Sequence, residues 1–224
     1  MAPGEPAPSA RPEPGRYGAL LILLIASYLL TALIKKPWIE AVQVVLFTVA
    51  VLLALRSASI PRRAVRLVMI VAIVGLPVMF VLSVSTATGD AGLGIADIWT
   101  ALVLLAAAVM IVRRVLSFGT VTMQSIYGAL SAYLVIGFMF AAVFAAIYHL
   151  NGDQFFARGE MANTQTFQYF SYTTLTTLGY GDFTAGYSTG RAVAVLEALT
   201  GQVFLATLVA RLVAAFRAPA DRQG

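Results

Sequence analysis

Six long blocks of apolar residues, nearly free of charged side chains, constrain this chain of 224 residues more than any other feature. Each block has 17 to 28 residues, and a helix of about 20 apolar residues crosses the ~30 Å hydrocarbon layer of a bilayer. Only 11% of the residues are charged, against about 25% in ordinary globular proteins, which argues against a soluble domain. The sequence therefore predicts an all-α polytopic membrane protein with six transmembrane helices. The predicted helices are Gly18–Ile34, Trp38–Leu55, Leu67–Ser85, Gly94–Val112, Ser125–Tyr148 and Thr189–Phe216.

Lysine and arginine residues predict the orientation of these helices, because basic residues accumulate in short cytoplasmic loops. With a cytoplasmic N-terminus, 11 of the 15 basic residues lie on the inner side. The four exceptions are Lys35, Lys36, Arg158 and Arg191. Both termini are therefore predicted to be cytoplasmic, with the segment 150–187 outside. Residues 1–17 contain five prolines and no apolar run, so we expect a disordered cytoplasmic tail there and a second short tail at residues 219–224.

The composition excludes several classes of function. The chain has no cysteine and a single histidine, His149, so one chain offers no thiol nucleophile, no disulfide and no multi-histidine metal site. Its basic residues lie at the ends of apolar blocks rather than among aromatic residues, which is not the pattern of a nucleic-acid-binding surface. No block carries a cluster of His, Asp or Glu suited to catalysis. We therefore expect no enzyme, no cofactor and no nucleic-acid partner, and we expect membrane lipids around the chain.

The segment between the last two blocks carries the most informative motif. Phe167–Thr176 is a stretch of about ten residues rich in aromatic and hydroxyl side chains, too short to cross a bilayer but long enough for a half-helix of about 15 Å. The residues from Thr177 to Asp182 then read Thr-Leu-Gly-Tyr-Gly-Asp. Non-helical backbone at membrane depth is tolerated only where it is buried in protein or lines a water-filled path. We therefore expect the half-helix to re-enter the membrane and the following residues to face a pore.

The glycines of this motif suit a cage of carbonyl oxygens. Gly179 and Gly181 permit the positive φ angles that a chain needs when all its carbonyls face one axis. The Thr177 hydroxyl can add an oxygen below this stack, and the C-terminal end of the half-helix directs its negative dipole end toward a cation. The side chain of Tyr180 is expected to point away from the axis, into an aromatic cuff. The cuff residues are Tyr169, Phe170 and Tyr172, for which an interfacial aromatic belt is the alternative.

The motif resembles the selectivity filter of the tetrameric potassium channel family, with Leu178 where valine is commoner. The resemblance covers residues 125–216 and implies that K⁺ binds at the carbonyl oxygens of four successive residues. These residues are Thr177, Leu178, Gly179 and Tyr180, and Gly181 completes the filter. One loop cannot surround an ion, so the resemblance implies a fourfold homotetramer. It also implies a four-helix transmembrane domain, residues 18–116, and a pore domain, residues 117–218.

Four residues around the motif are predicted to support the filter or its outer mouth: Thr173, Thr176, Asp182 and Glu197. Thr173 stands where some potassium channels carry a carboxylate on the pore helix. Asp182 is expected to raise the local cation concentration, and a helix cap or a solvated loop acid is the alternative. Glu197 is the acid deepest within a spanning block, and a carboxylate in hydrocarbon costs at least a few kcal/mol. We therefore expect Glu197 to meet donors of the half-helix and to brace the filter from behind, the alternative being a structural acid without effect on conduction.

Gly201 resembles the hinge glycine of the family's inner helix, and close helix packing is the alternative role for this residue. Glu197, Gly201 and Leu205 follow one another at intervals of four residues and share one helix face. Gly201, Leu205 and Val209 are our candidates for the hinge and the pore lining.

The fourth block lacks the charges of a voltage sensor. Such a sensor needs about three or four arginines per subunit, and Gly94–Val112 contains no basic residue. The first four helices are therefore expected to form a scaffold or to sense another stimulus. His149, with Asp153 four residues on, is a candidate external pH sensor, and an interfacial histidine without a role is the alternative.

The sequence as a whole predicts a potassium-selective channel that conducts passively and is not voltage gated. Its thirteen arginines against two lysines are typical of GC-rich genomes, so we expect a prokaryotic cell membrane. A weakly selective monovalent cation channel is the first alternative. A secondary transporter is the second, although transporters usually show paired interrupted helices, and here a single loop interrupts the pattern.

Overall fold

The computed structural model describes residues 16–34, 38–57, 75, 89–118, 120–152 and 154–217. These residues form helices joined by loops, and one isolated antiparallel bridge pairs Phe156 with Ala185. The helices are α1 (Arg16–Leu33), α2 (Trp38–Ser57), α4 (Gly89–Leu116), α5 (Met123–Asn151), α6 (Thr164–Leu175) and α7 (Ser188–Arg217). Three segments within them are long and apolar enough to cross a membrane, namely Gly89–Leu116, Met123–Asn151 and Ser188–Ala214. The described part of the chain is therefore that of a helical membrane protein.

The described helices other than α2 begin one to five residues before their predicted starts, as α1 and α4 illustrate. Helix α1 begins at Arg16, so the last two residues of the predicted tail are helical, and Tyr17 is buried beside Gly128 of α5. Helix α4 begins at Gly89, five residues before the predicted start, and Asp90 in its first turn suits the positive end of the helix dipole. The rest of the predicted tail and, apart from Gly75, the predicted third helix lie outside the described residues.

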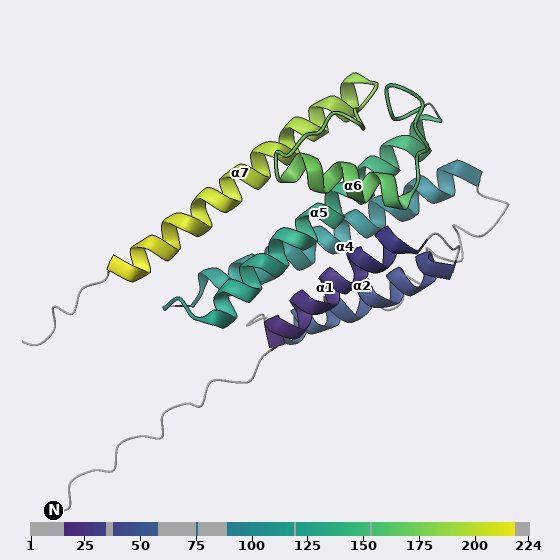
Figure 1. Cartoon of the computed structure of the whole chain (residues 1–224). Coiled ribbons are helices and arrows are strands. Elements are labelled where there is room, and N and C mark those ends of the chain that lie inside the picture. The colour runs from purple at the N-terminus through teal and green to yellow at the C-terminus, as the bar shows by residue number, and fades with distance from the viewer. Residues whose placement is uncertain are drawn as a thin grey trace, which may run out of the picture.

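Helices α1, α2, α4 and α5 lie side by side as a bundle, and α7 diverges from α5 with the short helix α6 between them (Figure 1). Helices α4 and α5 are antiparallel, because Gly94 near the start of α4 faces Leu150, whereas Val115 near its end faces Gly128. Helix α6 contacts both α5 and α7. We call the end of the bundle where α5 ends and α7 begins the loop end.

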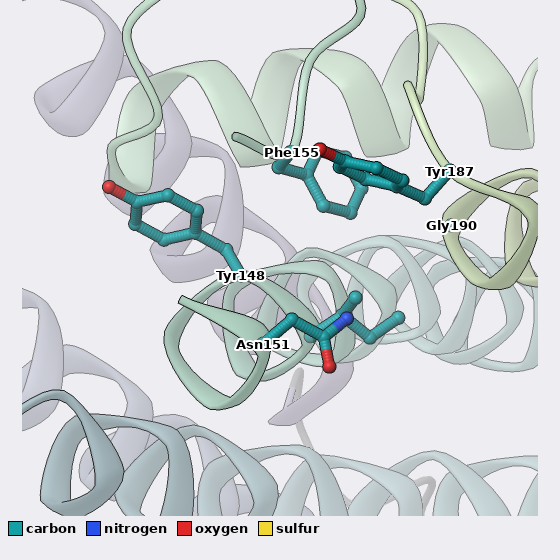
Figure 2. Close-up of a pocket in the computed structure, with 6 residues that line it drawn as sticks. Tyr148, Asn151, Phe155, Tyr187 and Gly190 are labelled. Carbon is teal, nitrogen blue, oxygen red and sulfur yellow. The ribbon is translucent and has the colours of Figure 1, made fainter. Parts of the chain in front are cut away.

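The loop end is held together by the segments before and after the motif. Gly152, with φ of 65°, ends α5, and a capping box between Asn163 and Thr166 begins α6. Two backbone hydrogen bonds of 2.8 Å, Ala157 N–H to Thr184 O and Gly186 N–H to Phe155 O, tie the two segments together. Beneath them lies a buried phenyl cluster made of Phe144, Phe155, Phe156, Phe167 and Phe170. A pocket beside Phe155, between Tyr148 and Tyr187, has a volume of only about 10 Å³, which suits a single water molecule (Figure 2).

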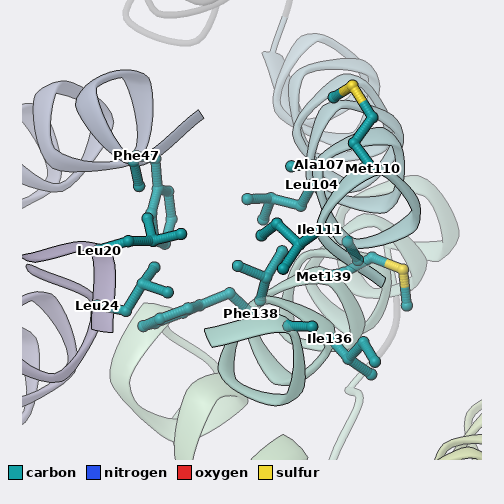
Figure 3. Close-up of a cluster of buried hydrophobic side chains, with 14 of the residues drawn as sticks. Leu20, Leu24, Phe47, Leu104, Ala107, Met110, Ile111, Ile136, Phe138 and Met139 are labelled. Carbon is teal, nitrogen blue, oxygen red and sulfur yellow. The ribbon is translucent and has the colours of Figure 1, made fainter. Parts of the chain in front are cut away.

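The core of the bundle joins the first helices to the helices around the motif. Leu20, Phe47 and Ile111, from α1, α2 and α4, converge on Phe138 of α5 (Figure 3). The ring of Phe138 makes edge contacts with Phe47, at 4.7 Å between centroids, and with Tyr172 of α6, at 5.5 Å. Through this chain of packed rings, helices distant in the sequence hold α6 in place.

Candidate functional site

Helix α6 is seated on the middle of α5 by side chains from both helices. Tyr133 Oη donates a hydrogen bond to Leu175 O at 3.1 Å, and Tyr172 Oη donates one to Leu134 O at 2.8 Å. Gly137 permits this approach, because a Cβ atom at that position would overlap the ring of Tyr172. The C-terminal end of α6 therefore lies about 15 Å along α5, which is near the middle of a bilayer if α5 crosses one.

The residues after α6, Thr177–Gly181, form what we call the filter segment, and their backbone alternates in handedness. Thr177, Gly179 and Gly181 have φ angles of 57°, 49° and 77°. The positive angles at the two glycines agree with the sequence prediction, and the one at Thr177 was not foreseen, because only glycine adopts such angles without strain.

The amide groups of the filter segment turn toward α6. The N–H groups of Leu178 and Gly179 donate to Thr173 O at 2.8 and 3.1 Å, and Thr177 N–H donates to Thr174 O at 2.9 Å. Among the described residues, none donates a hydrogen bond to a carbonyl oxygen of residues 177–181. The carbonyl oxygens of these five residues are therefore not occupied by hydrogen bonds within the described part of the chain. The same hydrogen bonds show that Thr173 contacts the filter segment through its backbone, whereas the Thr173 hydroxyl bonds back to Phe170 O.

The filter segment is exposed in the isolated chain. Leu178 and Tyr180 are 54% and 70% exposed. The aromatic cuff predicted around Tyr180 is not formed within one chain: Tyr169 packs on Phe183, Phe170 lies in the phenyl cluster, and Tyr172 packs on Tyr28 and Phe138. Within one chain the three rings therefore pack on separate neighbours, and a cuff that also uses rings of neighbouring copies stays a prediction.

Asp182 follows the filter segment and is exposed, as a residue of a mouth would be. Its Oδ2 accepts a hydrogen bond from Tyr169 Oη at 2.7 Å, and its Oδ1 accepts one from Phe183 N–H at 3.1 Å. The hydrogen bond to this carboxylate is the main cause that raises the pKa of Tyr169 to about 12. At neutral pH the phenol therefore stays a donor and fixes the carboxylate beside the filter segment.

Glu197 of α7 is fully buried where α7 meets α5 and α6, and its place behind the filter stays a prediction. Its Oε1 lies within hydrogen-bond distance of Ser171 Oγ, and Ser171 Oγ lies 2.7 Å from Gly137 O. Three helices therefore meet at one hydroxyl group. Ser171 lies within the half-helix Phe167–Thr176, which was expected to supply hydrogen-bond donors for Glu197.

A count of hydrogens limits the protonation state of this group. A serine hydroxyl has one hydrogen, so Ser171 cannot donate to both Gly137 O and Glu197 Oε1. A neutral Glu197 donates to Ser171 Oγ, which in turn donates to Gly137 O, and both contacts are then hydrogen bonds. Glu197 Oε2 is buried without a hydrogen-bond partner among the described residues, which would be far more costly for a charged carboxylate than for a carboxylic acid. The geometry therefore suits a neutral Glu197.

Gly201 packs against the end of α6. A Cβ atom at Gly201 would overlap Leu175 O, closer than real Cβ atoms approach other groups, and would make a tight contact of 3.0 Å with Leu175 C. This contact supports the packing role, and the hinge role stays a prediction. Leu205, one turn on, is half-buried, whereas Val209 is 56% exposed. The face shared by Glu197 and Gly201 therefore turns toward its own subunit, and of the pore-lining candidates only Val209 is clearly open.

Three polar contacts were missed by sequence reasoning because each joins residues distant in the chain. Gln202 Nε2 donates to Thr177 Oγ1 at 3.0 Å, although an amide within an apolar block is itself a signal of a polar partner. His149 Nδ1 lies 2.7 Å from Asp97 Oδ2 on α4, while Asp153, its predicted partner, lies outside the described residues. Arg211 of α7, read only as a topology signal, donates to the carbonyl oxygens that end α4, including Val115 O at 2.7 Å.

Residues 134–218 match the family model described as Ion channel. The match begins within α5 and runs through α6 and the filter segment to the end of α7, so it covers Thr177–Gly181, Asp182, Glu197 and Gly201. No curated protein and no solved structure matches the chain. The fold and the match together support a membrane protein with an ion channel domain. Passive conduction of ions is the activity that such a domain supports.

Proposed function

We propose that this chain forms a potassium-selective channel whose selectivity filter is the segment Thr177–Gly181. The observation that carries the proposal is the alternating backbone at Thr177, Gly179 and Gly181, with amide groups turned toward α6 and carbonyl oxygens left free. Such a row of carbonyl oxygens can replace the hydration shell of a dehydrated cation. K⁺ would bind at the carbonyls of residues 177–180, with the Thr177 hydroxyl at the inner end of the row.

The proposal requires several copies of the chain, because one filter segment presents oxygens to only one side of an ion. Exposure of α7 supports such an assembly: 11% of its apolar span is buried within the chain, against 39% for α4 and 50% for α5. Large apolar side chains of α7, such as Val195, Leu199 and Val203, are more than half exposed. We propose that four copies pack these surfaces together around one axis, with six spanning helices in each copy.

The flanking residues act on the filter from two sides. Asp182, held by Tyr169, would concentrate cations at the mouth. Thr173 and Thr176 belong to the end of α6, whose negative dipole end favours a cation. Glu197, linked to α5 and α6 through Ser171, would hold α7 and α6 together behind the filter and so keep its diameter constant.

The channel would not be voltage gated, because the apolar span of α4 has basic residues only in its last turn, at Arg113 and Arg114. We propose a prokaryotic cell membrane as its location, with both termini in the cytoplasm. Lipids and K⁺ are its only other expected partners, and no cofactor is required.

Purified protein in liposomes tests this function. The proposal predicts K⁺ flux that greatly exceeds Na⁺ flux, from particles whose cross-linked mass is that of four chains. Equal K⁺ and Na⁺ fluxes would indicate a weakly selective cation channel. Uptake of a solute driven by an ion gradient would indicate a secondary transporter.

A further inference from the structure

The side chain of Gln202 reaches from α7 to the inner end of the filter segment. Its Nε2 donates a hydrogen bond to Thr177 Oγ1 at 3.0 Å, and Thr177 Oγ1 itself donates to Thr176 O at 2.7 Å. A hydroxyl group has one hydrogen and two lone pairs. The hydrogen and one lone pair of Thr177 are therefore occupied by protein, and the second lone pair is left open in an exposed residue.

We propose that Gln202 is a positioning residue that holds the Thr177 hydroxyl with its oxygen, and not its hydrogen, toward a permeating cation. An amide N–H group beside the hydroxyl oxygen keeps the hydroxyl hydrogen away from α7, because two positive hydrogens repel each other. The hydrogen then stays on Thr176 O. This proposal rests on the proposed function and adds a residue that the filter motif does not contain.

Both ends of this hydrogen bond are fixed by the surrounding structure. Gly201, the neighbour of Gln202, lies against Leu175 O, and Tyr133 Oη also binds that oxygen. Thr177 is held by its N–H bond to Thr174 O at 2.9 Å and by its positive φ angle. A hydrogen bond between two fixed groups orients its partners without an added cost of ordering them.

A double-mutant cycle separates this role from a general structural one. The half-saturating K⁺ concentration for conductance is measured in the wild type, Gln202→Leu, Thr177→Val and the double variant. We expect Gln202→Leu to raise this concentration about two- to tenfold, the range that corresponds to one neutral hydrogen bond. In the Thr177→Val background, which lacks the hydroxyl, Gln202→Leu should cause no further change. Thr200→Val is the matched control, since the Thr200 hydroxyl donates to Leu196 O of the same helix.

The outcomes divide cleanly. An unchanged half-saturating concentration in Gln202→Leu, or the same change in both backgrounds, would overturn the proposal. If Gln202→Leu does not assemble, Gln202→Met, which keeps the length of the side chain, takes its place in the cycle. Failure of both variants to assemble would also overturn it, because a side chain that only positions a hydroxyl is not needed for assembly. A wild type without selective K⁺ conductance would instead refute the proposed function.

Discussion

Replacing Gly201 by alanine tests how α7 supports the filter segment. In a helix, glycine-to-alanine substitutions usually stabilise by about 0.5–1 kcal/mol. At Gly201 the added Cβ would overlap Leu175 O, so α7 and the end of α6 must separate by about 1 Å to restore an ordinary contact. The hydrogen bond from Gln202 Nε2 to Thr177 Oγ1, 3.0 Å long, would then exceed hydrogen-bond distance.

Two terms set the expected size of the effect. Inserting a methyl group into a packed site costs about 1–3 kcal/mol. Losing one neutral hydrogen bond adds about 0.5–1.5 kcal/mol. Together these terms amount to about 1.5–4.5 kcal/mol, and the helix-propensity gain of about 0.5–1 kcal/mol offsets part of them, so we expect Gly201→Ala to destabilise each chain by about 0.5–4 kcal/mol. Thermal dissociation of the purified oligomer, followed on gels, gives the stability, and reversal potentials give the selectivity of the same preparation.

Gly18→Ala of α1 is the control, because a Cβ atom there would meet the Tyr127 ring at an ordinary distance of 3.6 Å. This variant should be at least as stable as the wild type and should keep its selectivity. If Gly201→Ala also keeps wild-type stability and selectivity, the close contact between α7 and α6 is not what supports the filter segment. A variant with altered opening but unchanged stability would favour the hinge role.

Four further variants or conditions test other parts of the account. Gly179→Ala, at φ of 49°, should abolish K⁺ selectivity. Gly152→Ala, at φ of 65° and outside the filter segment, should keep selectivity, and an added Cβ has open space at both positions. Equal effects of the two variants on permeability ratios would refute the filter assignment. Glu197→Gln should assemble like the wild type, since an amide can replace a neutral carboxyl as donor to Ser171, and Glu197→Leu should lower oligomer stability by about 1–3 kcal/mol per chain. The hydrogen bond from Tyr169 to Asp182 should contribute its full stabilisation below pH 10, the ordinary pKa of tyrosine, and this stabilisation should be lost as the pH rises through about 12. A pH titration of oligomer stability should show this alkaline loss in the wild type and not in Tyr169→Phe. Conductance should lack steep voltage dependence, and activation curves as steep as those of several gating charges per chain would contradict it.

The elements of the channel domain could be predicted from sequence because each depends on local pattern. The length of the apolar blocks was enough to predict α5 and α7, and Gly179 and Gly181 predicted the positive φ angles at these two positions of the filter segment. The depth and polarity of Glu197 were enough to expect a hydroxyl partner on the half-helix.

The side-chain contacts between different helices could not be predicted, because the spacing of residues in a sequence does not say which helices lie next to each other. Asp97 meets His149 from 52 positions away, and Gln202 meets Thr177 from 25 positions away. The neighbours of the rings at residues 169, 170 and 172 within one chain could not be predicted for the same reason, and only the folded chain reveals them.

The reversal potential under bi-ionic conditions, with K⁺ on one side and Na⁺ on the other, tests the central claim most directly. A tenfold permeability preference for a monovalent ion shifts this potential by about 59 mV. Purified wild-type protein in a planar bilayer should give a reversal potential that differs from zero by at least that amount, with the sign expected for K⁺ as the preferred ion. Gly152→Ala should give the same value. A reversal potential near zero in wild-type protein would contradict the claim that residues 177–181 form a potassium-selective filter.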